Sequence, residues 1–345
     1  MRNRVIGGEF ELTELPVNVR GKSDYYSYAS GRAALYQILM SIKPSISKVW
    51  LPDWLCESMI DAVARSGRDY GFYKLGPDLR MEVAYFVAQN RPISVHDVIV
   101  LVNYFGLVDV ESTIEELREL KVDAVIIEDD VQALFSFFDN VPHAHVADYC
   151  FTSLRKSLAI PDGGLVKTKK AMPVVHGENT FSSYKLQGAL RKGFAVDSSE
   201  DDAYLSLFKQ GEDLIANNFD SEMSKESETL LAYADIKAAA IRRMENAQYL
   251  LLELEQLGIA PLLTIKENHV PLFVPILIDC RNEVRRALFE HDIFCPVHWP
   301  LREDMAHLSM GKRMAEKELS LVVDQRYNAE DMQCIVQVLK NAIWK

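Results

Sequence analysis

The chain has 345 residues, of which 48% are hydrophobic and 26% charged, a globular composition with enough material for two domains. Its formal net charge of -12 argues against nucleic-acid binding, because proteins that hold a phosphate backbone gather Lys and Arg. It shows no signal-peptide core, no run of roughly 20 apolar residues and no metal-finger spacing among its five cysteines, so we expect a cytoplasmic protein without a membrane partner.

The first 170 residues alternate short apolar runs with amphipathic stretches. One such stretch, residues 110–120, places Ile114, Leu117 and Leu120 at helical spacing. The apolar runs lie at 49–52, 98–105, 124–128, 149–154 and 163–168. Strands that are apolar throughout and alternate with helices indicate a mostly parallel sheet covered on both faces, with right-handed connections.

The second half of the chain has a different character. After a polar stretch, one long helix is predicted from Ser227 to Leu257, where Gly258 ends it. There follow a strand at 269–278, a helix at 281–291, a short strand near 295–299 and a helix at 329–343. This order predicts a smaller α+β domain, and we expect a large domain over residues 1–215 and a small one over 216–345.

Chemically active side chains follow the ends of the predicted strands. Asp129 comes directly after the run at 124–128, and Lys156 comes after the run at 149–154. Ser30-Gly31-Arg32 precedes a predicted helix. Because ligands of open α/β sheets bind at the carboxyl ends of the strands, we expect these groups to converge.

Together these groups suit pyridoxal 5'-phosphate (PLP). A lysine amine forms a Schiff base with the cofactor, a carboxylate keeps the pyridine ring protonated, and a helix N-terminus attracts the phosphate. Taken singly, each residue has a plainer interpretation: Lys156 as a solvated side chain, Asp129 as a turn former, Ser30 as an ordinary N-cap and Trp54 as a core residue.

Several segments of the chain resemble the sugar aminotransferases of the DegT/DnrJ/EryC1/StrS family, which are fold type I PLP enzymes. They are GGEFEL at residue 7, SGRAAL at 30–35, VNYFG at 102–106, VIIEDDVQA at 125–133, ADYCFTSLRKSLAIPDGG at 147–164 and LSLVVDQRYNAEDM at 319–332. The resemblance implies the three-layer αβα fold of aspartate aminotransferase, with a smaller C-terminal α+β domain. It also implies a homodimer whose active sites lie at the subunit interface.

The resemblance assigns roles to individual residues. Asp129 pairs with the pyridine nitrogen, Gln132 lies near the ring hydroxyl, and Lys156 forms the Schiff base. The phosphate is held by Ser30, Gly31, Arg32 and Ser153, the ring stacks on Trp54, and the substrate meets His298. Arg326 is a further substrate candidate, because an anionic sugar nucleotide needs local positive charge in an acidic chain; its plainer interpretation is a structural ion-pair partner. The chain departs from the family at Asn103, Phe151 and Arg32, where the family often has His, Ser and Thr, which places it in an outlying branch.

The expected function is amino transfer from an amino acid such as glutamate to a keto-sugar nucleotide, as in polysaccharide biosynthesis. Two alternatives stay open at this point. One is another PLP reaction on the same fold, such as decarboxylation or carbon–carbon bond formation, and the other is a non-catalytic ligand-binding relative. No metal is expected, because His143 and His145 have no evident further ligand.

Overall fold

The computed structural model describes residues 5–15, 24–42, 47–138, 146–195, 201–267, 269–300 and 309–343. Its central sheet has the strand order β2-β8-β7-β6-β5-β3-β4, and β8 runs antiparallel to both of its neighbours. The strands are β2 (Tyr26–Tyr28), β3 (Val49–Pro52), β4 (Tyr70–Tyr73), β5 (Val98–Val102), β6 (Val125–Asp129), β7 (Tyr149–Ser153) and β8 (Gly164–Lys167). The predicted mostly parallel sheet is confirmed.

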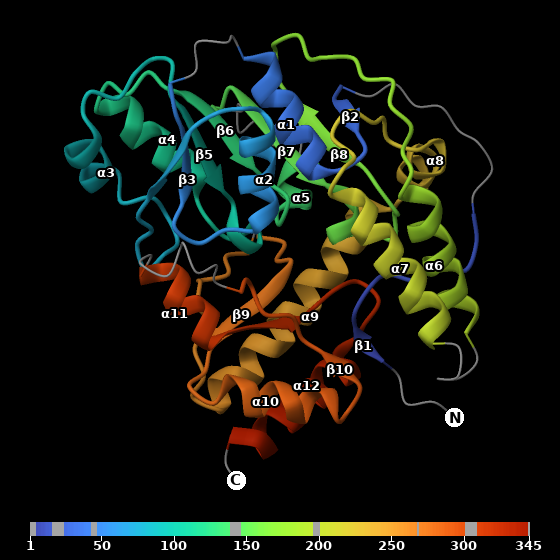
Figure 1. Ribbon diagram of the computed structural model, residues 1–345. Coiled ribbons are helices and arrows are strands. Elements are labelled where there is room, and N and C mark those ends of the chain that lie inside the picture. The colour runs from blue at the N-terminus through green and yellow to red at the C-terminus, as the bar shows by residue number, and fades with distance from the viewer. Residues whose placement is uncertain are drawn as a thin grey trace.

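Helices cover this sheet. β5 and β7 bury every residue along their length, as expected of strands covered on both faces. Figure 1 shows α1 and α2 in front of the sheet, with α3 and α4 beside its left edge. These helices and two 3₁₀ turns are α1 (Gly31–Ser41), α2 (Glu57–Arg65), α3 (Val83–Asn90), η1 (Tyr104–Gly106), α4 (Val110–Glu119), α5 (Leu134–Phe138) and η2 (Leu154–Lys156).

A second group of helices stands beside the sheet. It consists of α6 (Ser182–Phe194), α7 (Asp201–Ile215) and α8 (Lys225–Tyr233), and Figure 1 shows α6 and α7 side by side. Tyr204 and Phe208 of α7 share a buried cluster with Leu154 and Leu165, which lie next to the ends of β7 and β8. This packing brings α7 to the same edge of the sheet as Lys156.

The C-terminal part forms a smaller α+β unit with its own hydrophobic cluster. Its elements are α9 (Ile236–Gln256), β9 (Phe273–Leu277), α10 (Arg281–Phe289), β10 (Ile293–Phe294), α11 (Ser309–Lys317), β11 (Glu318–Val322) and α12 (Ala329–Ile343). β9 and β11 pair antiparallel. In Figure 1 this unit lies below the large sheet.

The N-terminal segment ties the small unit to the helical group. β1 (Ile6–Gly7) pairs with β10 in parallel, and the Leu12 N–H donates to the Ala189 carbonyl of α6 at 3.0 Å. Gly7 has a φ of +96°, and a Cβ there would lie 2.5 Å from the Phe294 carbonyl oxygen. This close approach requires glycine.

Some sequence predictions need correction. The single helix predicted from Ser227 to Leu257 is broken at Ala234, because Asp235 caps a new helix by accepting from the Ala238 N–H at 2.9 Å. The strand predicted near 295–299 is β10, which ends before Cys295. β2 and β4 had no prediction, since both are half-exposed edge strands without a continuous apolar run.

The predicted domain division between residues 215 and 216 stays a prediction. Leu230 of α8 packs into the cluster of the sheet edge, whereas Ala247 and Leu250 of α9 pack into the cluster of the small unit. This packing favours a division near the start of α9. Within the described residues, no helix combines the length and apolarity needed to cross a membrane.

Candidate active site

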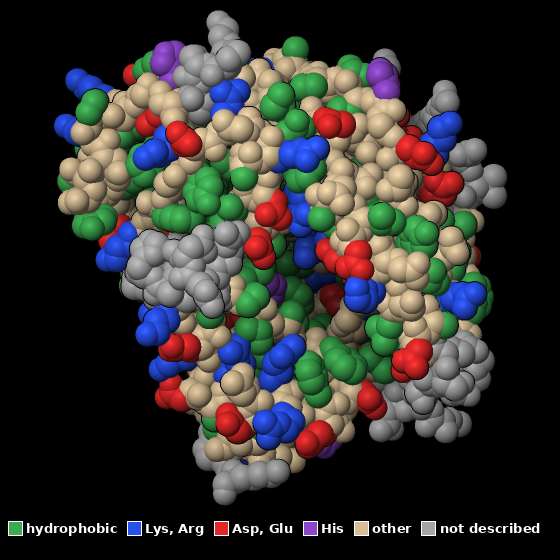
Figure 2. Space-filling view, viewed as in Figure 1, with side chains coloured by type: hydrophobic (Ala, Val, Ile, Leu, Met, Phe, Trp, Pro, Cys, Tyr) green, Lys and Arg blue, Asp and Glu red, His purple; other side chains and the backbone are tan. Residues whose placement is uncertain are grey.

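A pocket of about 280 Å³ lies at the carboxyl ends of the parallel strands, where the large sheet faces the small unit. Its mouth is the hollow at the centre of Figure 2. Eight of the ten predicted site residues line it, namely Ser30, Gly31, Arg32, Asp129, Gln132, Ser153, Lys156 and His298. The structure thus brings these eight residues together in one pocket.

The first turn of α1 forms one wall of the pocket. Ser30 caps the helix, and its hydroxyl accepts from the Ala33 N–H at 3.1 Å. A Cβ on Gly164 would lie 2.1 Å from the Ser30 carbonyl oxygen, so only glycine lets β8 approach the helix start this closely. Arg32, in the same turn, forms an ion pair with Asp61, in which Nη1 lies 3.8 Å from Oδ2.

The two adjacent aspartates at the end of β6 point to different surroundings. Asp129 lines the pocket, and one of its oxygens accepts from the Val131 N–H at 2.8 Å. Asp130 accepts instead from the Asn103 amide and from the Cys150 thiol, each at 3.2 Å. Burial raises the pKa of Asp129 to about 7. Asp129 is thus the carboxylate available to a ligand, and Asn103 serves to hold Asp130.

Gln132 lies on the same side of the pocket. Its side-chain oxygen accepts from the Phe105 N–H at 3.0 Å, and Phe105 has a φ of +59°. This bond fixes the amide of Gln132 at the pocket wall, so that its NH₂ group points away from Phe105 and can serve a ligand.

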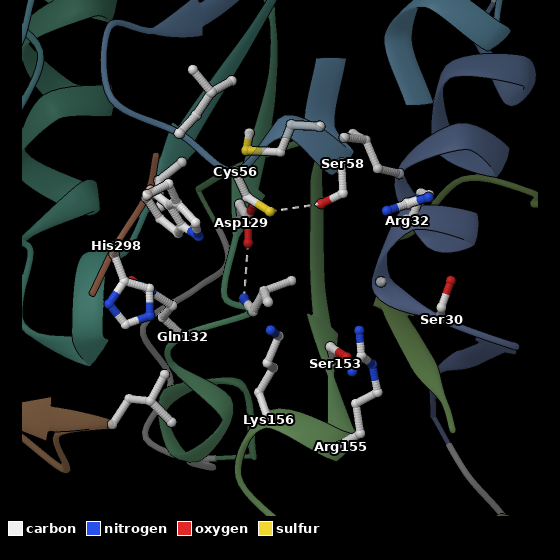
Figure 3. Close-up of a pocket in the computed structure, with 18 of the residues that line it drawn as sticks. Ser30, Arg32, Cys56, Ser58, Asp129, Gln132, Ser153, Arg155, Lys156 and His298 are labelled. Carbon is white, nitrogen blue, oxygen red and sulfur yellow. Dashed lines mark hydrogen bonds between the residues drawn. The ribbon is translucent and has the colours of Figure 1, made fainter. Parts of the chain in front are cut away.

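Lys156 occupies the last position of the η2 turn that follows β7. Figure 3 shows its amine pointing toward Asp129, with Ser153, Arg155 and Arg32 to the right. Lys156 keeps exposed surface, but partial desolvation of its amine, together with the charge of Arg155, lowers the pKa of Lys156. A larger share of this amine is therefore neutral and nucleophilic near pH 7 than for a solvated lysine.

An ion-pair network lies beside Lys156. Both terminal nitrogens of Arg155 bind Glu212 of α7 at 3.1 Å, and the buried Lys185 bridges Glu212 at 2.8 Å and Glu9 at 3.2 Å. Although burial opposes ionisation, Arg155 and Lys185 lower the pKa of Glu212 to about 2. The network fixes Arg155 at the edge of the pocket with its positive charge balanced.

Two predicted site residues lie elsewhere. Trp54 is buried, stacks on Tyr104 at 5.0 Å and packs against Trp299, so its ring is a core element rather than a wall of the pocket. Arg326 binds Asp324 at 2.8 Å and Glu11 at 2.9 Å. It lines an adjoining cavity of about 350 Å³, which also reaches Lys156.

His298, the predicted substrate contact, lies in the wall of the pocket that the small unit forms. It lines the pocket, and its Nδ1 lies 3.0 Å from the hydroxyl of Ser320. Its ring packs against Phe105 and Phe273. These contacts hold the imidazole in the small-unit wall.

Sequence reasoning missed several lining residues. Cys56 and Ser58 come just after β3, at the same sheet edge as Asp129, so their place after a strand was a usable signal. Glu212 comes from a helix distant in sequence, and no local pattern marks it. The described residues contain no group of three or more His, Cys, Asp or Glu able to hold a metal ion, and His143 and His145 lie outside those residues.

No protein-family model and no curated protein matches the chain. Solved structures do match it. A DegT/DnrJ/EryC1/StrS aminotransferase from Brucella abortus has a TM-score of 0.66 and 17% identity, covering 92% of this chain and 85% of that one. The aminotransferase TlmJ from Streptoalloteichus hindustanus has a TM-score of 0.67 and 16% identity, covering 93% and 86%. The sugar aminotransferase Spr1654 from Streptococcus pneumoniae, in its PMP form, has a TM-score of 0.67 and 17% identity, covering 92% and 85%.

These likenesses extend over more than nine tenths of the chain at low sequence identity. They agree with the three-layer arrangement of the large sheet and with the smaller α+β unit beside it. The chain has the fold of the PLP-dependent aminotransferases.

Proposed function

We propose that this protein is a PLP-dependent aminotransferase in which Lys156 holds the cofactor. The observation that carries the proposal is the meeting of Lys156 and Asp129 in one pocket, from the ends of the neighbouring strands β7 and β6. A lysine amine that forms the Schiff base and a carboxylate that partners the pyridine nitrogen are a combination that PLP enzymes use. Structures with this fold include a sugar aminotransferase in PLP and PMP forms.

The residues of the pocket fit PLP. The Ser153 hydroxyl and the first turn of α1 are donors suited to a phosphate. A Cβ on Gly31 would lie 3.1 Å from Val131 and 3.2 Å from Ser153, so glycine keeps this corner open. On the opposite side, Asp129 suits the ring nitrogen and the amide of Gln132 suits the ring hydroxyl.

Each residue then has a definite role. Bound PLP supplies an electron sink for the reacting carbon of the substrate. Asp129, whose pKa burial raises to about 7, would ionise beside a protonated ring nitrogen and would keep that proton in place. The Lys156 amine, with its lowered pKa, takes and returns a proton at the substrate carbon.

For substrates we propose an amino acid such as glutamate as donor and a keto-sugar nucleotide as acceptor. The pocket adjoins the second cavity at Lys156, and this combined space suits a long, hydroxylated molecule. His298 is a proposed contact for this substrate. Arg326 stands in the wall of the second cavity, where its charge is largely used by Asp324 and Glu11.

We also propose that the protein works in the cytoplasm as a homodimer, in polysaccharide biosynthesis, with part of each site supplied by the partner. The resemblance of its sequence motifs to the DegT/DnrJ/EryC1/StrS family supports this. Light scattering at micromolar concentration checks the assembly. A fully active monomer would contradict it.

The test of function is spectroscopic. Purified protein loaded with PLP should lose its visible absorbance band when glutamate is added, because the amino group passes to the cofactor. A panel of keto-sugar nucleotides and simple 2-keto acids is then added to the aminated form. Return of the band with keto-sugar nucleotides supports the proposal, whereas return with 2-keto acids alone contradicts the substrate class. A band that never responds to any amino donor favours a different PLP reaction.

A further inference from the structure

A buried arginine lies behind Lys156, where it lines the second cavity but not the pocket itself. Arg243 of α9 has 1% of its surface exposed. Its hydrogen bonds in the described structure go to neutral oxygens: the Gln325 side chain and the carbonyls of Pro271, Leu272 and Ser157. Asp324 interacts with its charge, and the guanidinium lies 5.3 Å from the centroid of the Phe135 ring, but burying a cation whose hydrogen bonds go to neutral acceptors is still costly. Such a residue needs a reason beyond general packing.

One set of these bonds holds the turn that carries Lys156. The carbonyl oxygen of Ser157, the residue after Lys156, accepts from Arg243 Nη2 at 3.2 Å and from Gln325 Nε2 at 2.8 Å. Arg243 Nε also donates to Gln325 Oε1 at 2.8 Å, which fixes the orientation of that amide. Two donors from the small unit therefore hold the backbone one residue beyond the reactive lysine.

The same guanidinium also holds the opposite wall of the pocket. Arg243 Nη1 donates to the Leu272 carbonyl at 3.0 Å, and Leu272 lines both the pocket and the second cavity. The Leu272 N–H donates to the Phe105 carbonyl at 2.9 Å, and the Phe105 N–H in turn binds Gln132. The planar guanidinium of Arg243 thus connects the turn that carries Lys156 to Leu272, which is hydrogen-bonded through Phe105 to Gln132.

We propose that Arg243, with Gln325, is a positioning residue that sets the reach of the Lys156 amine into the pocket and links it to the small unit. This rests on the proposed function, since it assumes that Lys156 is the reactive group. The competing explanation is a purely structural tie between the two units, which would affect stability and leave the amine unchanged.

Two measurements on four proteins separate these explanations: the wild type, Arg243→Lys, Gln325→Leu and the control Arg242→Lys. The control removes a guanidinium from the same helix, where Arg242 is half exposed and pairs with Glu245 at 3.3 Å. The first measurement is the pH dependence of Lys156 acetylation in the cofactor-free protein, by peptide mass spectrometry. The second is the rate at which PLP becomes attached to Lys156.

Arg243→Lys should raise the pH midpoint of Lys156 acetylation by about half a unit, because a loosened turn lets the amine move away from Arg155, whose charge lowers the pKa of Lys156. It should slow PLP attachment roughly tenfold or more, since small misplacements of a reacting group are costly. Gln325→Leu should change the acetylation midpoint and the attachment rate in the same directions but by smaller amounts. Arg242→Lys should match the wild type in both. Gln325→Leu leaves the buried Arg243 in place. If Arg243→Lys does not fold, Gln325→Leu therefore distinguishes positioning of Lys156 from a purely structural tie.

A lower melting temperature with an unchanged midpoint and attachment rate, in both variants, would overturn the proposal and leave a structural tie. Failure of the proposed function looks different. In that case the wild type itself attaches no PLP, while the acetylation midpoints of the cofactor-free proteins still report whether Arg243 positions Lys156.

Discussion

The pocket has a strand side, at the ends of β6 and β7, and an outer side, toward α7. The two sides differ in whether their charged groups are bound by partner residues. On the strand side, Asp129 and Lys156 present their functional atoms to the cavity. On the outer side, Glu212 is bound by Arg155 and Lys185, and in the adjoining second cavity Arg326 is bound by Asp324 and Glu11. Groups that react must stay available, whereas groups that shape a site are better held by partners.

The largest expected effect tests the strand side. Lys156→Ala should lower turnover roughly 10³-fold or more, because the amine that moves the proton is gone. Lys209→Ala is the matched control, since Lys209 is exposed and pairs with Asp213 on the surface of α7. Initial rates of amino transfer measure both. Comparable rates for the two variants would show that Lys156 is not the reactive lysine.

The adjacent aspartates provide the next test. Asp129→Asn should cost roughly 10²-fold in turnover, because a neutral amide cannot hold the proton on the ring nitrogen. Asp130→Asn should leave turnover within about tenfold and instead lower the free energy of unfolding by roughly 1–3 kcal/mol, since Asp130 accepts from Asn103 and Cys150. Denaturant unfolding and rates are measured on both. If Asp130→Asn instead lost turnover and Asp129→Asn lost only stability, Asp130 would be the carboxylate that holds the ring proton.

Glu212→Gln tests the outer side through its dependence on pH. The pKa of Glu212 is lowered to about 2, so its contribution to stability is fully present above its unfolded pKa and is lost as the pH falls through about 2. The melting temperature of the variant should therefore lie below that of the wild type at pH 6, and the gap should narrow toward pH 2.5. A constant gap over this range would mean that the charge of Glu212 does not contribute.

The smallest effect on function is expected at Trp54. Trp54→Phe should lower the free energy of unfolding by roughly 1–2 kcal/mol, because the smaller ring makes fewer contacts with Tyr104 and Trp299. PLP affinity should change by no more than about twofold, since the ring does not line the pocket. Equilibrium binding and denaturant unfolding measure the two quantities. Weak PLP binding at normal stability would restore Trp54 as a stacking residue.

The two sides also differ in how far the sequence predicts them. Asp129, Ser153 and Lys156 stand at the ends of continuous apolar runs, and parallel strands bring such ends to one edge. Glu212 is placed there by the packing of α7 against the sheet edge, which no local pattern encodes. A position after a strand does not decide which side chain faces the cavity. After β3 the residues that line the pocket are Leu55 and Cys56, and Trp54 does not line it.

The break at Ala234 has a similar cause. Helix-forming residues surround it, so periodicity alone predicts one helix from Ser227 onward, although the Asp235 side chain caps a second helix. An aspartate within a helical pattern is a signal for a new N-terminus only when the chain must turn between two packed units. That need is set by tertiary structure.

The central claim is that Lys156 is the residue that holds PLP, and one measurement tests it most directly. Protein incubated with PLP is reduced with borohydride, digested and mapped by mass spectrometry. The account predicts a stable cofactor adduct on the peptide that contains Lys156, and no such adduct in Lys156→Ala. An adduct on another lysine, or none in the wild type, would contradict it.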